Sequence, residues 1–332
     1  MAERDGATVA ARRFARRFSE SKGLVVPIPI TDVVEDIADL DIDSFPWTID
    51  CDGVVIERSG ERPCVIINSE RPPVRQRFTL AHELGHIVLP WQAGSIFCHT
   101  RITHIPSDAL VRAIEADAQA FASEILIPEE WLADRVGYDA GDDRKLAAAV
   151  IELAGEAVVS VIAASLSAIR ILPSESVLVL TEDGVVTYAL KSPESVCNEP
   201  ERGKPFDATS YTNVGAAVSS ATYGAAKTRS VYVIQFDRDV ASKRTGESSK
   251  EILVEILLEA GFSGTDLKTM QNRIGGIVGH ANNLALRSRS ATKDRLAALQ
   301  SRFAGRSKLK DIVSHRRFHD YLNAKANELA KK

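Results

Sequence analysis

Two histidines and a glutamate stand close together in the run His82-Glu83-Leu84-Gly85-His86. If this run is helical, residues four apart lie on one face, so both imidazoles can bind one metal ion. The glutamate beside the first histidine would lie near that ion, where it can act as a general base toward water. This H-E-x-x-H pattern is typical of zinc peptidases. The sequence therefore predicts a zinc ion held by His82 and His86, with Glu83 as the catalytic base.

The flanking residues predict the helix that this spacing requires. Pro72 and Pro73 suit a helix start, and Pro90 would stop the helix one turn after His86. The apolar side of the helix would consist of Phe78, Ala81, Leu84, Val88 and Leu89. The alternative is an ordinary helix that carries two unrelated histidines.

A catalytic zinc site needs a third protein ligand and one open position. Residues 107–128 predict a second helix, with a capping residue at its start and a proline just past its end. Within it Glu115 lies beside the apolar stripe and near Ala118 and Ala122, whose small side chains would let two helices approach. Asp117 is the competing candidate, but it is shorter and about 200° round the helix from Glu115. We expect Glu115 to be the third ligand; the alternative is that both acids face solvent.

These two blocks carry a family resemblance. FTLAHELGH followed by E-x-x-A-x-x-F-A-x-x-(I/L)-L-x-P, here beginning at Glu115, resembles the ImmA/IrrE family of bacterial metallopeptidases. PIPITDVVEDIAD and DGVVIERSGERPCVIINSE resemble that family's opening helix and hairpin, and LAAAVIELAGEAVVSVIAASLSAI resembles its closing helix pair, so the resemblance covers residues 24–172. It implies a zincin-like, gluzincin-type metalloendopeptidase in which His82, His86 and Glu115 bind zinc and Glu83 is the base.

The resemblance also implies a biological role. Members of the family cleave helix-turn-helix repressors and so switch on stress, mobile-element or phage-defence genes. We therefore expect a helix-turn-helix repressor as the substrate and a role in DNA damage response or phage defence. The sequence departs from the family at Gln119, where Asn or Asp is frequent and a hydrogen-bond partner for the metal ligands is expected. The alternative is a DNA-binding regulatory protein whose metal site is structural or vestigial, although such a site does not need Glu83.

Length and composition bound the fold class. A chain of 332 residues with 45% hydrophobic and 26% charged residues is long enough for two or more domains. We expect an α+β protein: a zincin-like metallopeptidase domain with an HExxH helix, then a small α/β module and a basic helical C-terminal region. The predicted ranges are an N-terminal basic arm at 1–23, the peptidase domain at 24–172, a small sensor or regulatory module at 173–240, and the basic region at 241–332. We expect the arginine cluster of the arm to lie on a solvated helical face; the alternative is contact with nucleic acid.

Three observations bear on localisation. No apolar run approaches the roughly 18 residues that span a bilayer, and the first residues lack the apolar core of a secretory signal. The four cysteines are far apart and form no C-x-x-C pair. We therefore expect a reducing, cytoplasmic setting and no membrane partner.

The basic region at 241–332 stands out by charge. It holds 18 Lys and Arg against 9 Asp and Glu, while the whole chain has a net charge of −4. It predicts four helices, at 251–262, 270–289, 294–303 and 308–332. A basic helical face is typical of polyanion binding, and we expect single-stranded DNA to act there as an activator. The candidate contacts are Arg287, Arg289, Arg316 and Arg317. The alternative is a solvated surface, or one that meets the acidic remainder of the chain.

Cys98 is a candidate inhibitory fourth ligand. It lies between the two predicted zinc-binding helices, 12 residues after His86 and 17 before Glu115. A thiolate binds zinc strongly and would fill the position that water needs. His99 is an alternative occupant and His104 a weaker one. The competing interpretation is that Cys98 is a small apolar core residue.

Overall fold

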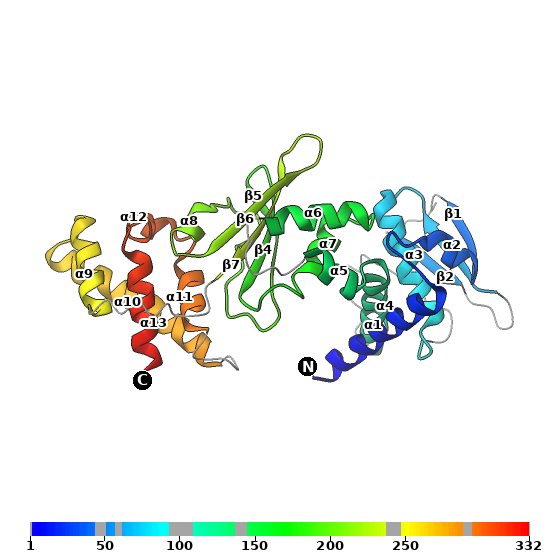
Figure 1. Cartoon of the computed structure of the whole chain (residues 1–332), viewed down its shortest axis with the longest axis horizontal. Coiled ribbons are helices and arrows are strands. Elements are labelled where there is room, and N and C mark those ends of the chain that lie inside the picture. The colour runs from blue at the N-terminus through cyan, green and yellow to red at the C-terminus, as the bar shows by residue number, and fades with distance from the viewer. Residues whose placement is uncertain are drawn as a thin grey trace. The chain divides into compact units, whose positions relative to one another are not determined.

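A computed structural model of the chain describes residues 2–43, 51–56, 62–92, 109–136, 145–236, 247–287 and 294–331. The chain divides into two compact units (Figure 1). Unit 1 comprises residues 1–137 and 152–167, and unit 2 comprises residues 138–151 and 168–332. Both units combine helices with a small sheet, which confirms the mixed α and β class.

Unit 1 contains a three-stranded sheet and most of the N-terminal helices. Its elements are α1 (Ala2–Lys22), α2 (Ile30–Glu35), β1 (Asp39–Asp43), β2 (Gly53–Ile56), β3 (Cys64–Asn68), α3 (Pro73–Val88), α4 (Ala109–Leu126) and α5 (Glu129–Val136). The helices α6 (Leu146–Glu156) and α7 (Val161–Ala168) follow. The strand order is β1-β3-β2, with β3 parallel to β1 and antiparallel to β2. The expected hairpin is therefore the β2–β3 pair.

The helices α3 and α4 pack closely against each other. Helix α3 begins after Pro72, has Pro73 in its first turn and ends at Val88, as its flanking prolines predict. Close packing is possible because α3 has a glycine at the contact. A Cβ added to Gly85 would lie 3.3 Å from the Cα of Ala118 and 3.2 Å from the ring of Phe121. The small residues thus bring the two backbones near enough for a side chain of α4 to reach α3.

The N-terminal helix α1 packs along α4 (Figure 1). Arg16 Nε donates to Glu124 Oε1 at 2.7 Å, and Arg12 is 3.4 Å from the other oxygen of the same carboxylate. The Glu124 side chain is fully buried, and its hydrogen bond is the main cause that raises the pKa of Arg16. Our interpretation of a solvated arginine face is therefore wrong for these two residues, because a buried carboxylate needs a paired cation.

Unit 2 is built on a four-stranded antiparallel sheet. Its strands are β4 (Ser176–Glu182), β5 (Val185–Lys191), β6 (Ala217–Tyr223) and β7 (Arg229–Gln235), in the order β5-β4-β7-β6. The predicted turn between β4 and β5 is present, and Asp183 and Gly184 both have positive φ, at 50° and 75°. That is the backbone of a two-residue hairpin with a matching twist. Strand β6 and the short helix α8 (Thr209–Thr212) arise from a stretch with no predicted element.

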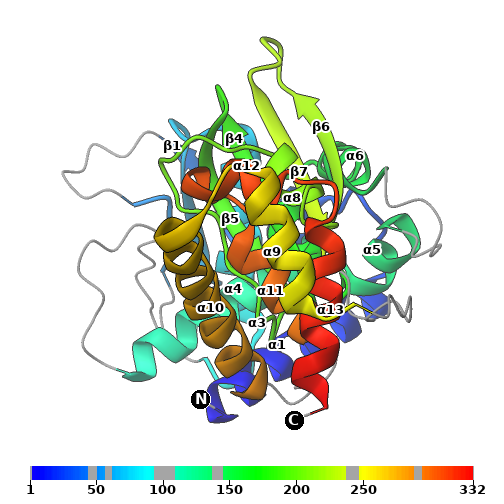
Figure 2. The same ribbon diagram turned by 90° about the vertical axis from the view of Figure 1, so that its left-hand side faces the viewer.

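Helices complete unit 2, and Figure 2 shows α9, α10, α11 and α13 beside one another. They are α9 (Ser249–Glu259), α10 (Gly264–Arg287), α11 (Arg295–Phe303), the 3₁₀ turn η2 (Ser307–Leu309), α12 (Lys310–Val313) and α13 (Phe318–Ala330). Three predicted helices are present, but the continuous helix at 308–332 is wrong. The chain breaks there because the backbone N–H of Arg317 donates to the His315 side chain and so leaves the helical pattern.

The buried side chains of these helices include Phe303, Phe318 and Tyr321. The ring centroid of Phe318 lies 5.2 Å from that of Phe303 and 5.6 Å from that of Tyr321. Among the helices of the described ranges, none is long and apolar enough to cross a membrane.

Candidate metal centre

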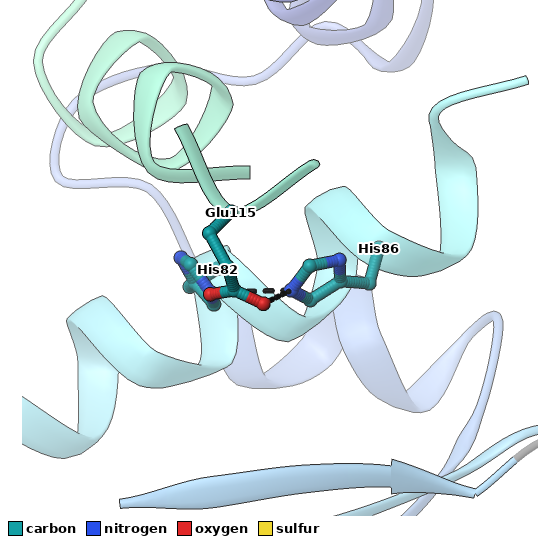
Figure 3. Close-up of side chains that lie close together, drawn as sticks. All are labelled: His82, His86 and Glu115. Carbon is teal, nitrogen blue, oxygen red and sulfur yellow. Dashed lines mark hydrogen bonds and ion pairs between the residues drawn. The ribbon is translucent and has the colours of Figure 1, made fainter. Parts of the chain in front are cut away.

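Three side chains from α3 and α4 converge in unit 1 (Figure 3). His82 and His86 are one turn apart on α3, and Glu115 reaches them from α4. The two imidazole Nε2 atoms are 3.2 Å apart. The carboxylate oxygens of Glu115 are 3.3 Å from Nε2 of His82 and 3.6 Å from Nε2 of His86. Both histidines are buried, whereas the Glu115 side chain is 22% exposed.

This arrangement fits a tetrahedral metal ion. Zinc binds nitrogen and oxygen ligands at about 2.0–2.1 Å, so two ligands of a tetrahedral site are about 3.3–3.4 Å apart. The two Nε2 atoms, 3.2 Å apart, and the Glu115 oxygen 3.3 Å from Nε2 of His82 lie close to that value, and the 3.6 Å separation from His86 is made by the other oxygen of the same carboxylate. Two histidines and one carboxylate leave a fourth position for water or substrate. The cluster could therefore hold a catalytic rather than a closed structural ion.

Gln92 determines which nitrogen of His86 faces the cluster. The Gln92 Nε2 donates to the carbonyl oxygen of Ile114 at 3.0 Å, which turns its Oε1 toward His86. That Oε1 lies 2.7 Å from His86 Nδ1. Because an amide oxygen only accepts, Nδ1 carries the proton and Nε2 keeps its lone pair for a metal ion.

The electrostatic setting keeps His86 neutral. Burial is the main cause that lowers its pKa to about 4, and the neighbouring His82 acts in the same direction. Glu115 and the hydrogen bond to Gln92 oppose the shift. At neutral pH the ring is therefore uncharged, which is the form that binds metals.

Glu83 lies on α3 under the strand β2. The residue is fully buried. A Cβ added to Gly53 would be 3.0 Å from Glu83 Oε1 and 2.5 Å from Thr79 Cγ2. Because a larger residue at this position would clash, only glycine lets β2 lie this close to α3. The Glu83 side chain is therefore enclosed between β2 and α3.

The competing acid on α4 is directed elsewhere. Asp117 Oδ2 accepts a hydrogen bond from Trp91 Nε1 at 2.9 Å, and the residue is buried. Burial raises the pKa of Asp117, and the Trp91 hydrogen bond opposes that shift. Gln119, where we expected a partner for the metal ligands, is exposed, and Gln92 contacts His86 instead. Cys98, His99 and His104 lie outside the described residues, so a fourth protein ligand stays a prediction.

A small apolar hollow is lined by residues of the same two helices, one turn away along the chain from His82 and from Glu115. It has a volume of about 160 Å³ and is lined by side chains of α3, α4 and α7, among them Phe78, Gln119, Ala122 and Ile162. The Phe78 ring is next to that of His82, with centroids 6.4 Å apart. Gln119 is one turn beyond Glu115 on α4. Phe78 and Gln119 are therefore the residues that link the hollow to the three converging side chains.

The four arginines proposed for nucleic-acid contact are in unit 2. Arg317 forms ion pairs with Glu247 and Glu255, so its positive charge is compensated by carboxylates of the same unit. Arg316 is exposed. Arg287 is the last residue of α10, and Arg289 lies outside the described residues.

Residues 29–165 match the sequence profile of the IrrE N-terminal-like domain, which defines a peptidase family, M78. The chain therefore carries a peptidase domain of the ImmA/IrrE family. The matched range contains His82, Glu83, His86 and Glu115, and it accounts for the resemblance seen in the sequence. It also contains Gln92. No sequence motif predicts the contact of Gln92 with His86, because this contact depends on the path of the chain after Pro90.

Other similarities to this chain are distant. A Mycobacterium tuberculosis transcriptional regulator of known structure is 13% identical, with a TM-score of 0.36 over 68% of this chain and 87% of that chain. No protein of curated function matches the chain.

Proposed function

We propose that this protein is a zinc-dependent endopeptidase with a zincin-like catalytic domain. The proposal is carried by one observation: His82, His86 and Glu115 offer three ligand atoms within 4.8 Å of one another. The H-E-x-x-H motif adds Glu83, which follows the first of these histidines and is buried in the same helix. A structural zinc site does not require such a carboxylate, whereas peptide hydrolysis needs a base.

A bound zinc ion would polarise the scissile carbonyl and make water acidic enough to react at neutral pH. Glu83 accepts the proton of the attacking water and passes it to the departing amine nitrogen. Gln92 holds His86 in the tautomer that directs Nε2 to the ion. The apolar hollow beside His82 is suited to a hydrophobic side chain next to the scissile bond.

As the substrate we propose a helix-turn-helix repressor, whose cleavage would switch on stress, DNA-damage or anti-phage defence genes. We assign the peptidase role to residues 24–172 and regulatory roles to 173–240 and to the basic region at 241–332. Single-stranded DNA is the activator proposed for the basic region. The support for it is composition, and binding through phosphates should weaken steeply with salt.

The decisive experiment replaces the base and keeps the ligands. The full chain, loaded with zinc, is mixed with the helix-turn-helix protein encoded beside its gene. Glu83→Gln should retain zinc and fold while cleavage falls below detection, because the carboxylate that accepts the proton is gone. Glu152→Gln, an exposed glutamate of α6, is the matched control and should cleave normally.

Two outcomes would count against the proposal. Cleavage by zinc-loaded Glu83→Gln would refute the role of the base. A wild-type protein that binds zinc and DNA but never cleaves a repressor would favour the other class, a DNA-binding regulator with a structural metal site.

A further inference from the structure

Unit 2 contains a cavity of about 770 Å³ far along the chain from the metal centre. Its walls are the loop at 198–207, the helix α8, the end of α11 and the start of α12. Small-molecule sites in proteins usually have volumes of about 300–1,000 Å³. The cavity is thus large enough for a ligand of metabolite size.

Four cations line this cavity without an ion-pair partner among the described residues. Arg302, Arg306 and Lys310 all line it, and Lys204 joins them from the loop. Among the described residues, no carboxylate forms an ion pair with any of these four, in contrast to Arg317, which has two. Within the described ranges, the two arginine side chains form one hydrogen bond, from Arg306 Nε to the carbonyl oxygen of Arg302 at 2.6 Å.

Arg302 is the most informative of the four. It is half-buried, and its Nε is buried with no hydrogen-bond partner. Burial is the main cause that lowers its pKa, and the nearby charge of Arg306 lowers it further. Placing two guanidinium groups together and burying one of them costs free energy unless an anion is bound. Planar guanidinium groups are well suited to bidentate contacts with phosphate oxygens.

An aromatic pair stands on another wall. The rings of Phe206 and Tyr211 stack with their centroids 5.5 Å apart and an interplanar angle of 29°, and both residues line the cavity. Tyr232 also packs on Phe206, with ring centroids 4.6 Å apart, and Phe206 is the partly exposed member of the pair, so the remaining surface of its ring can contact a nucleobase. The loop also contributes Glu199 and Glu201. These carboxylates would repel a simple anion but can accept hydrogen bonds from the amino and hydroxyl groups of a nucleoside.

From this combination we infer that unit 2 binds a purine nucleotide, with its phosphates on Arg302, Arg306 and Lys310 and its base against Phe206. The site belongs to unit 2 alone and does not depend on the proposed peptidase activity. The site also explains part of the positive charge of residues 241–332, because Arg302, Arg306 and Lys310 of this region line the cavity.

Titration calorimetry on the full chain tests the inference, with ADP, GDP, inorganic pyrophosphate and a 5′-phosphorylated single-stranded oligonucleotide as separate probes. We expect saturable binding of ADP or GDP. Arg302→Gln and Arg306→Gln should each weaken it about tenfold or more, since each removes a charge-assisted contact. Phe206→Leu should weaken nucleotide binding roughly tenfold and leave pyrophosphate binding unchanged.

Lys308→Gln is the matched control, because Lys308 is exposed in the same segment but does not line the cavity; it should bind like the wild type. Arg306 is exposed, so its variant keeps the test valid if Arg302→Gln fails to fold. The inference is overturned if neither nucleotide binds, if Lys308→Gln loses as much affinity as the arginine variants, or if pyrophosphate binds as tightly as the nucleotides. It is equally overturned if the oligonucleotide binds more tightly through the same arginines, which would make the site a nucleic-acid contact.

Discussion

His86 Nδ1 and Gln92 Oε1 are 2.7 Å apart, and the same amide of Gln92 donates to the carbonyl of Ile114, the residue before Glu115. One buried side chain therefore links a residue of α3 to the backbone of α4 at the place where the third converging residue emerges. Partners of this kind orient metal-binding histidines and typically contribute 10–100-fold to metal affinity.

Replacing Gln92 should therefore weaken zinc binding without removing a ligand. We expect Gln92→Ala to lower zinc affinity by roughly 10–100-fold, measured by competition with a chromogenic chelator. Gln92→Glu should restore much of it, because a carboxylate oxygen also accepts a hydrogen bond from Nδ1–H. Gln119→Ala is the control, as that residue is exposed on α4. Equal losses in Gln92→Ala and Gln119→Ala would mean that Gln92 has no special positioning role.

The two acids of α4 should behave differently. Glu115→Ala should abolish high-affinity zinc binding, because it removes one of three converging groups. Asp117→Ala should leave zinc bound and lower the free energy of unfolding by about 0.5–1.5 kcal/mol, the net value of one hydrogen bond, because Trp91 is exposed and its Nε1–H can bond to water instead. Zinc content by atomic absorption and thermal unfolding separate these effects. Loss of zinc in the Asp117 variant alone would show that the ligand assignment is wrong.

Cys98 provides a test of inhibition by a fourth ligand. If its thiolate occupies the open position, Cys98→Ser should raise basal cleavage of the repressor without an activator. Zinc-edge absorption of the resting protein should then show one sulfur at about 2.3 Å. Cys64→Ser, on β3, is the control. Nitrogen and oxygen neighbours alone, with unchanged basal activity, would leave Cys98 as an apolar side chain.

Alkaline pH should destabilise unit 2 through Tyr211. Burial, followed by the charges of Asp207 and Cys197, raises the pKa of this phenol to about 12, whereas an unfolded tyrosine titrates near 10. The folded state therefore holds its proton more tightly, and its contribution to stability is complete below about pH 10 and is lost as the pH rises through 12. The shift corresponds to roughly 2–3 kcal/mol.

Ultraviolet absorbance of the phenolate and denaturant unfolding between pH 9 and 12, roughly this window, measure the effect. Tyr211→Phe should remove one late-titrating tyrosine and flatten the pH dependence of stability. Tyr188→Phe, at a more exposed position, is the control. An unchanged titration curve in Tyr211→Phe would contradict the prediction.

The sequence by itself determined the local features of this protein. Spacing of four residues places His82 and His86 on one helical face, and prolines bound that helix at both ends. The Asp183-Gly184 turn could equally be predicted, because Asp-Gly favours the type I′ hairpin turn, in which both residues have positive φ. These features depend on contacts between near neighbours in the chain, which composition and periodicity encode directly.

Only the tertiary structure decided which distant residues meet. It brought Glu115 to the histidines and Asp117 to Trp91, and it placed Gln92 behind His86, although no pattern marks that glutamine. It also paired Arg16 with the buried Glu124, 108 residues away, and left Arg302 without a carboxylate among the described residues. The physical reason is that ion pairing and burial depend on which helices pack together, and the separation of two residues along the chain does not record that choice.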